Sequence, residues 1–232
     1  MVVNALAVGC GLNVAAAQAR KFASDHHCFM VCRFDRTDAG QRLHFASAMT
    51  LTRHQDGDDY STGVSYLELA EVLIRNGAQT KADLQELWSR IVFNILVSNS
   101  DNHLRNHGFI LVPGKGWRLS EAYDINPVPR ADGLKLNITE ADNALDMELA
   151  REVAEYFRLK LTDADEIIAS YPWDSQPVEN YCGQPYSSLP GAGANGGGVQ
   201  MCNVSSKLQI IFGALSFTAS RNSTSDGTPL KF

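Results

Sequence analysis

The residue types most able to do chemistry in this sequence gather in one polar stretch, residues 99–107. Within it Asp101 and Asn106 lie five positions apart, and Asp124 follows further along the chain. Phosphoryl transfer requires a carboxylate that orients or deprotonates the attacking hydroxyl, together with oxygen ligands that hold magnesium against the phosphates. Asp101 could be the first group, and Asn106 with Asp124 could be the metal ligands. The spacing therefore suggests a phosphoryl-transfer site.

Two other interpretations of this stretch remain open. Asp and Asn are common in polar loops, where they often serve only the loop itself. His103 and His107 are four positions apart with Asp101 nearby, so they could instead bind zinc from one face of a helix. The glutamate of the H-E-x-x-H motif is absent, however, and Gly108 follows His107 directly, which makes zinc the weaker interpretation.

The elements on either side of the stretch are predicted to hold it rigidly. Before it, apolar residues recur at helical spacing over 80–98 and predict a buried helix of about five turns. After it, apolar segments at 108–112 and 117–119 flank a Gly-rich turn and predict a hairpin. The chain should return through this hairpin and bring Asp124 beside the loop that contains Asp101. The apolar helix positions are Leu84, Leu87, Trp88, Ile91, Val92, Ile95 and Leu96.

The other elements are predicted from local signals. Ser65 followed by Glu68 is a capping-box pattern, and Gly77 is expected to end that helix in the left-handed conformation. Thr80 with Asp83 marks the expected start of the long helix. The remaining predictions are a helix end within residues 2–19 that turns at Gly11, a buried strand over 28–32, a loop over 53–63, and helices over about 142–160 and 163–171.

Composition excludes several classes of protein. Hydrophobic residues make up 44% of the 232 residues and charged residues 20%, which suits a chain with a buried core. The formal net charge of −6 and the lack of a helix-turn-helix pattern disfavour a DNA-binding regulator. No run of about 18 apolar residues occurs. The five cysteines are odd in number and form no CxxC pair, which argues against a disulfide framework or structural zinc site and favours a reducing, cytoplasmic location.

The composition changes after about residue 173, where Ser, Gly and Asn begin to dominate and charged residues become rare. We therefore expect residues 1–175 to form one domain. Residues 176–232 are expected to be a low-complexity tail that is either flexible or unrelated to the domain.

Two longer segments around the polar stretch resemble a known family. Asn99 to Phe109 reads N-S-D-N-H-L-R-N-H-G-F, and Trp117 to Pro127 reads W-R-L-S-E-A-Y-D-I-N-P. Both resemble the core of HipA-type serine/threonine kinases, the toxins of bacterial type II toxin–antitoxin modules, and residues 33–36 resemble their R-F-D-R segment. The resemblance covers about residues 5–173. It implies an α+β, mainly helical fold, namely the C-terminal lobe of a protein-kinase-like fold with a short catalytic β-hairpin.

The resemblance also implies a role for each matching residue, with ATP and Mg²⁺ as cofactors. Asp101 would be the catalytic base, while Asn106 and Asp124 would hold magnesium. The other matches would contact the nucleotide: His103 and Tyr123 would line its site, Cys32, Arg33 and Phe34 would form the hinge beside adenine, and Asp35 would lie near the ribose. Without the resemblance, the simpler interpretation is that Phe34 packs in the core and that Asp35 pairs with Arg33 or Arg36.

One part of the family pattern is not found in the sequence. A kinase also needs a glycine-rich loop over the phosphates and a strand lysine paired with a helix glutamate, and neither precedes Cys28. We therefore expect the N-terminal lobe to be largely missing and the kinase activity to be weak or absent. The competing hypothesis is a catalytically dead remnant or binding module that retains the C-lobe. The resemblance further implies a protein substrate and a DNA-binding antitoxin partner, with no direct nucleic-acid binding and no membrane.

Overall fold

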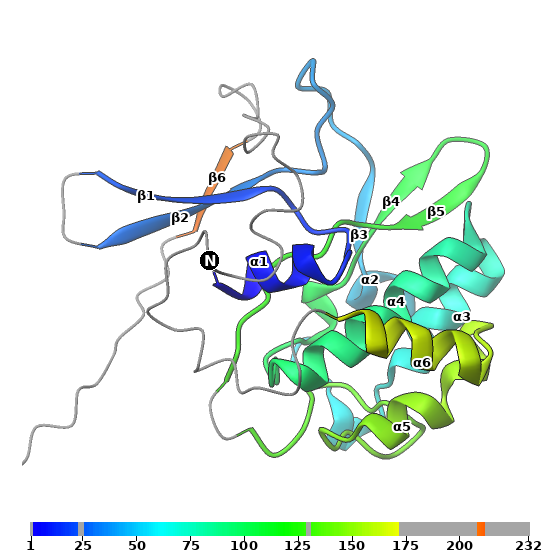
Figure 1. Ribbon diagram of the computed structural model, residues 1–232. Helices are drawn as coiled ribbons and strands as arrows, with labels where there is room; N and C mark the ends of the chain where they lie inside the picture. Colours follow the sequence, from blue (N-terminus) through cyan, green and yellow to red (C-terminus); the bar gives the residue numbers. More distant parts are fainter. Residues whose placement is uncertain (1, 23–25, 129–130, 172–207, 212–232) are drawn as a thin grey trace, which may run out of the picture.

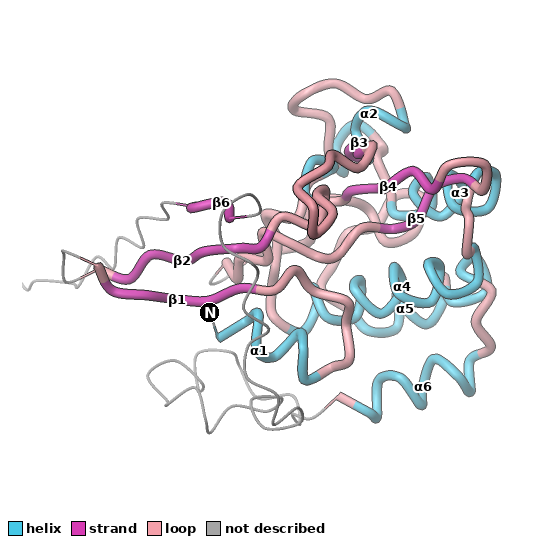
Figure 2. The backbone as a smooth tube through the Cα atoms, turned by 90° about the horizontal axis from the view of Figure 1, so that it is seen from above, coloured by secondary structure: helices cyan, strands magenta, loops and turns pink. Residues whose placement is uncertain are grey.

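The computed structural model describes residues 2–22, 26–128, 131–171 and 208–211. Most of the helices form one group, with a small sheet against it, and a second sheet extends away from this group (Figure 1). The tube seen from above shows the same separation between the strands β1, β2 and β6 and the helices (Figure 2). No helix within the described ranges is long and apolar enough to cross a membrane.

The centre of the helical group is α4 (Thr80–Leu96), which lies where the apolar periodicity predicted a buried helix. Six of the seven predicted apolar positions are buried, and Leu96 is half-buried. The Trp88 indole N–H donates a 2.7 Å hydrogen bond to the Ala150 carbonyl, so this large side chain is buried without an unpaired donor. The helix α3 (Tyr66–Asn76) packs on α4 and contributes to the same core.

The predicted hairpin is confirmed as β4 (Gly108–Val112) and β5 (Gly116–Leu119), an antiparallel pair. A third strand, β3 (Phe45–Ser47), pairs with β4 on its other edge. Gly108 is required there because a Cβ would lie 2.3 Å from the Phe45 ring. The short helix α2 (Ala48–Thr52) follows β3 directly.

One predicted helix end differs from the structure. The Ser65–Glu68 capping box is present, but Gly77 is extended, with φ −77° and ψ 137°, and not left-handed. Its glycine is needed for space, since a Cβ would lie 2.3 Å from the Leu73 carbonyl oxygen. The helix α4 starts at Thr80 as predicted, although Gln79 holds the cap position and the Thr80 hydroxyl bonds the Leu73 carbonyl.

The expected helix over 142–160 is wrong. The structure has a short helix α5 (Met147–Glu152), a 3₁₀ turn over Ala154–Phe157 and then α6 (Leu161–Ser170). The helix α5 starts late because the Asp146 carboxylate caps the Glu148 N–H, and the 3₁₀ turn that follows ends at Arg158, which takes a left-handed conformation with φ 58°. The apolar spacing in the sequence continues through the ends of α5 and of the 3₁₀ turn, so it did not reveal them.

The second sheet consists of β1 (Ala17–Lys21), β2 (His27–Cys32) and β6 (Leu208–Ile211), with β2 in the centre. It follows α1 (Val2–Gly9), which ends as predicted before Gly11, whose φ is +74°. The expected tail over 176–232 otherwise lies outside the described residues. Pairing of β6 with β2 nevertheless attaches four of its residues to the sheet.

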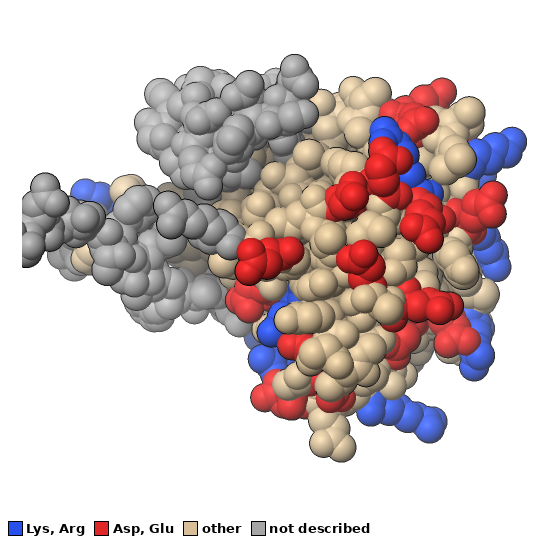
Figure 3. Space-filling model, turned by 90° about the horizontal axis from the view of Figure 1, so that it is seen from below, with Lys and Arg blue, Asp and Glu red and all other residues tan. Residues whose placement is uncertain are grey.

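Cys32 is disulfide-bonded, which the cysteine pattern did not lead us to expect. Pairing depends on which thiols meet in space, and spacing along the chain does not report this. Cys10 and Cys28 are free thiols. The acidic composition is visible on the face seen from below in Figure 3, where Asp and Glu spread over most of the coloured surface and Lys and Arg lie mainly towards one edge.

Candidate active site

The loop after α4 has a defined shape set by its own hydrogen bonds. Ser98 leaves the helix in the left-handed region with φ 52°. The chain then forms a 3₁₀ turn over Leu104–Asn106. The Asn106 side-chain amide donates a 3.2 Å hydrogen bond to the Asp101 carbonyl. These two predicted site residues are therefore held together by a direct contact, while Asp101 itself is exposed.

The segment around Asp124 is fastened to this loop on both sides. On one side the Tyr123 hydroxyl donates a 2.6 Å hydrogen bond to the Arg105 carbonyl. On the other, the Asn126 N–H donates to the Asn99 side-chain oxygen at 3.3 Å. Asp124 lies between these contacts in a left-handed conformation with φ 54°, which Asp tolerates better than most residues. The hairpin thus returns Asp124 beside the polar loop, as the sequence predicted.

The carboxylates in this region suit a hard cation. In the described part of the chain, no Lys, Arg or His side chain pairs with the carboxylate of Asp101 or Asp124. One oxygen of Asp124 accepts a 2.8 Å hydrogen bond from the Asn126 amide. No group of three or more His, Cys, Asp or Glu that could hold a metal occurs among the described residues. Two oxygen ligands, Asp124 and Asn106, still fit Mg²⁺, which takes one or two protein carboxylates and completes its shell with phosphates and water.

A buried polar network supports the loop from below, and the sequence reasoning missed it. The Tyr66 hydroxyl, fully buried, accepts hydrogen bonds from the side-chain amides of Asn94 at 3.3 Å and Asn102 at 3.2 Å. The Asn94 oxygen in turn accepts from the Asn99 amide at 3.0 Å. Because Asn102 follows Asp101 and Asn99 holds Asn126, this network fixes both parts of the site. The available signal was an Asn inside the otherwise apolar stripe of α4.

Arg90 joins three segments behind the site, namely α4 and the segments that contain Asn13 and Ser120. Its side chain is 5% exposed and pairs with Glu86 at 2.7 Å. One guanidinium nitrogen also donates to the Asn13 carbonyl at 3.1 Å and to the Ser120 carbonyl at 2.8 Å. Ala122 completes the link, since its N–H donates to the Asn13 carbonyl at 2.7 Å. The segment that leads to Asp124 is thereby positioned from α4.

The two histidines of the loop have different environments. They lie at the two ends of the 3₁₀ turn and not on one helix face, which removes the geometry proposed for zinc. His107 is buried against the edge of Tyr66, and burial, with smaller effects from Arg90 and His103, lowers its pKa to about 3. Its Nε2 and the Nδ1 of His103 are buried and have no hydrogen-bond partner within the described residues. The unused His103 Nδ1 is compatible with an acceptor on a ligand, such as a phosphate oxygen.

Of the residues expected at the hinge, Phe34 lies next to Tyr123. Its ring is 5.2 Å from the Tyr123 ring and 5.9 Å from the Phe45 ring, but it is only half-buried and lies outside the hydrophobic core that its simpler interpretation assumed. Burial, and less strongly the charge of Asp124, raises the pKa of Tyr123, which keeps its hydroxyl protonated and able to donate. Cys32 uses its N–H to bond the Ala16 carbonyl at 2.7 Å. That donor is therefore engaged within the sheet and not available to an adenine ring.

Asp35 forms ion pairs with Arg33 and Arg36, as the simpler interpretation of this residue predicted. Its carboxylate accepts hydrogen bonds from Arg33 at 2.8 and 2.6 Å and from Arg36 at 2.6 Å. The hydrogen bond from Arg33 is the main cause that lowers the pKa of Asp35, and Arg36 adds to it. A ribose contact would have to share this carboxylate with two guanidinium groups.

Comparison with known proteins identifies the family. The sequence pattern of the HipA-like C-terminal domain family matches residues 1–172 of this chain. The chain belongs to this family. A curated relative of this HipA-like chain is a Haemophilus influenzae protein named as a candidate kinase, 29% identical over 109 residues that cover 44% of this chain and 32% of the relative. The chain thus spans about a third of that relative's length.

Two solved structures share the fold. HipA of Shewanella oneidensis MR-1, determined with HipB and its operator DNA, matches with a TM-score of 0.60 and 21% identity over 73% of this chain and 45% of HipA. The Helicobacter pylori proinflammatory kinase CtkA matches with a TM-score of 0.50 and 13% identity over 78% of this chain and 77% of CtkA. The HipA-like chain is therefore a mixed α/β structure, with helices and small sheets, that resembles the C-terminal region of these proteins.

Proposed function

We propose that this chain forms the catalytic lobe of an ATP-dependent serine/threonine protein kinase of the HipA type. The observation that carries the proposal is the pair of hydrogen bonds, from Tyr123 and Asn126, that holds Asp124 against the loop of Asp101. Two carboxylates without a cationic partner are thereby kept beside an amide, Asn106, in an arrangement that matches what phosphoryl transfer requires.

In this proposal each residue has one task. Asp101 accepts the proton of the substrate hydroxyl and orients it for attack. Asn106 and Asp124 hold Mg²⁺, which when bound neutralises charge on the phosphates. His103, whose Nδ1 has no partner within the described residues, is placed to donate to a phosphate oxygen. The segment of Arg33 and Phe34 contacts the adenine, because the Cys32 N–H is used within the sheet.

The proposal also includes two partners of this chain, an antitoxin and a protein substrate. HipA of Shewanella oneidensis occurs with HipB and operator DNA in its structure, and by analogy we propose an antitoxin partner that binds DNA. A protein carries the accepting serine or threonine. The alternative is a remnant that keeps the fold without the chemistry.

Nucleotide titration by calorimetry, with and without Mg²⁺, tests the proposal. We expect ATP to bind more tightly with Mg²⁺, and we expect Asp124→Asn to abolish this dependence. Glu140→Gln, at an exposed carboxylate outside the site, is the matched control and should behave like the unmodified chain. Asp101→Asn should retain nucleotide binding while losing any transfer of radioactive phosphate to protein. ATP binding that is indifferent to both Mg²⁺ and Asp124 would refute the metal assignment.

A further inference from the structure

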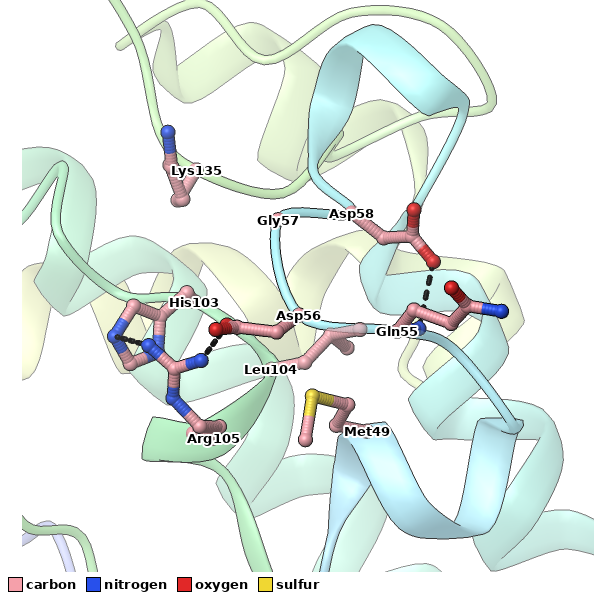
Figure 4. Close-up of a pocket in the computed structure, with 9 residues that line it drawn as sticks. All are labelled: Met49, Gln55, Asp56, Gly57, Asp58, His103, Leu104, Arg105 and Lys135. Carbon is pink, nitrogen blue, oxygen red and sulfur yellow. Dashed lines mark hydrogen bonds and ion pairs between the residues drawn. The ribbon is translucent and has the colours of Figure 1, made fainter.

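A pocket of about 140 Å³ opens beside the loop that contains Asp101 (Figure 4). Residues 103–105 form one wall, and residues 55–58, from the loop after α2, form another. Met49 and Lys135 complete the lining. Among the lining residues, His103 has a task in nucleotide binding as proposed above, whereas Arg105 and the 55–58 loop have none and are available to another ligand.

Arg105 is the fixed cation of this pocket. Its carbonyl accepts the 2.6 Å hydrogen bond from Tyr123, and it lies within the 3₁₀ turn that ends at Asn106. Its guanidinium lies 3.5 Å from His103 Nε2. The main chain is thus held in position, while the side chain is 47% exposed and presents its guanidinium to the pocket. A guanidinium presents a fork of donors that matches the two oxygens of a carboxylate or phosphate.

Asp56 now pairs with Arg105, and this ion pair can be replaced readily. The Asp56 side chain is 77% exposed and that of Arg105 is 47% exposed, so water competes with the contact. Asp56 precedes Gly57, whose φ is +98°, in the loop that forms the far wall. If another anion takes the guanidinium, the Asp56 carboxylate can return to water at little cost. The arginine is therefore preorganised and the aspartate is the exchangeable partner.

The other acids near the pocket are already engaged. Asp58 lies 3.2 Å from His54 and accepts a 2.8 Å hydrogen bond from the Gln55 N–H, and its carboxylate points away from Arg105 in Figure 4. Lys135 also lines the pocket, but its ammonium is 3.0 Å from the Asp59 carboxylate and points away from Arg105 in Figure 4. The cation that an incoming anion would meet is therefore Arg105.

We propose that this pocket binds an anionic side chain of the protein substrate, an aspartate, glutamate or phosphorylated residue, on Arg105 in place of Asp56. The identity of the occupant as a substrate rests on the proposed kinase function. Arg105 follows Asp101 by four residues, and four residues span at most about 14 Å. In an extended substrate segment, the acidic residue therefore lies within about four positions of the serine or threonine that reaches Asp101.

Fluorescence anisotropy with labelled peptides, without nucleotide and at physiological ionic strength, tests this inference. One peptide has a central serine with Asp at each of the four positions before it and the four positions after it. Three matched peptides have Asn, Lys or phosphoserine at those positions. We expect the Asp and phosphoserine peptides to bind at least about tenfold more tightly than the Asn peptide, the scale of a charge-assisted contact. Asp56→Asn should tighten binding by up to about fivefold, the upper range for an exposed ion pair. Arg105→Gln should remove the preference for acid.

Arg151→Gln is the matched control, because Arg151 is another exposed arginine paired with acids, at Glu148 and Asp165, outside the pocket. It should bind the Asp peptide like the unmodified chain. Arg105→Lys keeps the charge without the fork and should bind at an intermediate level. This variant also provides a result if Arg105→Gln does not fold.

Several outcomes would overturn the inference. These are equal binding of the Asp and Asn peptides, tighter binding of the Lys peptide, or equal effects of the Arg105 and Arg151 variants. Displacement of the Asp peptide by ATP would assign the pocket to nucleotide phosphates instead. If nucleotide binding fails while the acid preference persists, the kinase proposal fails and the pocket assignment for an anion stands.

Discussion

The Tyr66 hydroxyl offers a direct test of the network beneath the site. Tyr66→Phe removes one oxygen and preserves the ring that fills the core. Two buried amide donors, from Asn94 and Asn102, then lose their acceptor. An unsatisfied buried donor costs about 1–3 kcal/mol, and the hydrogen bonds are long, at 3.2 and 3.3 Å. We therefore expect the free energy of unfolding to fall by about 2–4 kcal/mol.

Urea denaturation measures this loss, and Tyr156→Phe provides the control because Tyr156 is 57% exposed. The control should change the free energy of unfolding by less than about 0.5 kcal/mol. A double-mutant cycle with Asn102→Ala should show coupling, since the Asn102 side chain loses its acceptor when the Tyr66 hydroxyl is removed. A loss under about 0.5 kcal/mol for Tyr66→Phe, or strict additivity in the cycle, would refute the network.

Three further predictions concern stability. Ile91→Ala in the buried face of α4 should lower the free energy of unfolding by about 2–5 kcal/mol in chemical denaturation, against less than about 0.5 for a surface change. His107 has a folded pKa near 3, so stability should fall by up to about 1.4 kcal/mol per pH unit as pH drops from about 6.5 towards 3. His107→Phe should flatten that slope in acid titrations followed by circular dichroism. His54 has a raised folded pKa because the hydrogen bonds and charges of Glu68 and Asp58 outweigh its burial, so its stabilising effect is present below pH 6.5 and lost as pH rises through the folded pKa. The protection of residues 55–58 against hydrogen exchange, corrected for the intrinsic rise of exchange with pH, should then fall at high pH, and this fall should disappear in His54→Gln.

Local patterns predicted the elements whose signals are strong and continuous. The stripe that includes Leu87 and Ile91 predicted α4, and the Gly-rich turn before β5 predicted the hairpin. The patterns failed where tertiary contacts decide. Gly77 looked like a left-handed helix end, but its glycine serves the close approach to Leu73. The helix over 142–160 was broken by Asp146 capping, a contact that periodicity cannot detect.

The candidate site was predictable in its loop residues and not in its supports. Asp101, Asn106 and Asp124 follow a spacing that can be compared with a known chemistry, and their segments do meet in the structure. Arg90 and Tyr66 have no such spacing, since, apart from Glu86, the partners named for them lie 28 to 77 positions away along the chain. Only the folded chain reveals that their polar groups are satisfied.

Several residues that depart from ordinary local rules lie around the site, although others, such as Arg158 with its positive φ, lie elsewhere. Asp124 and Ser98 have positive φ although they are not glycine. Arg90 and Asn94 are polar residues of α4 whose side chains are buried. Each would cost stability in isolation. Here each is compensated by a hydrogen bond that fixes either the Asp101 loop or the Asp124 segment. A fold that only needed a stable core could have used apolar side chains at Arg90 and Asn94. The concentration of compensated exceptions on both sides of Asp101 is therefore the physical reason to locate function at this loop.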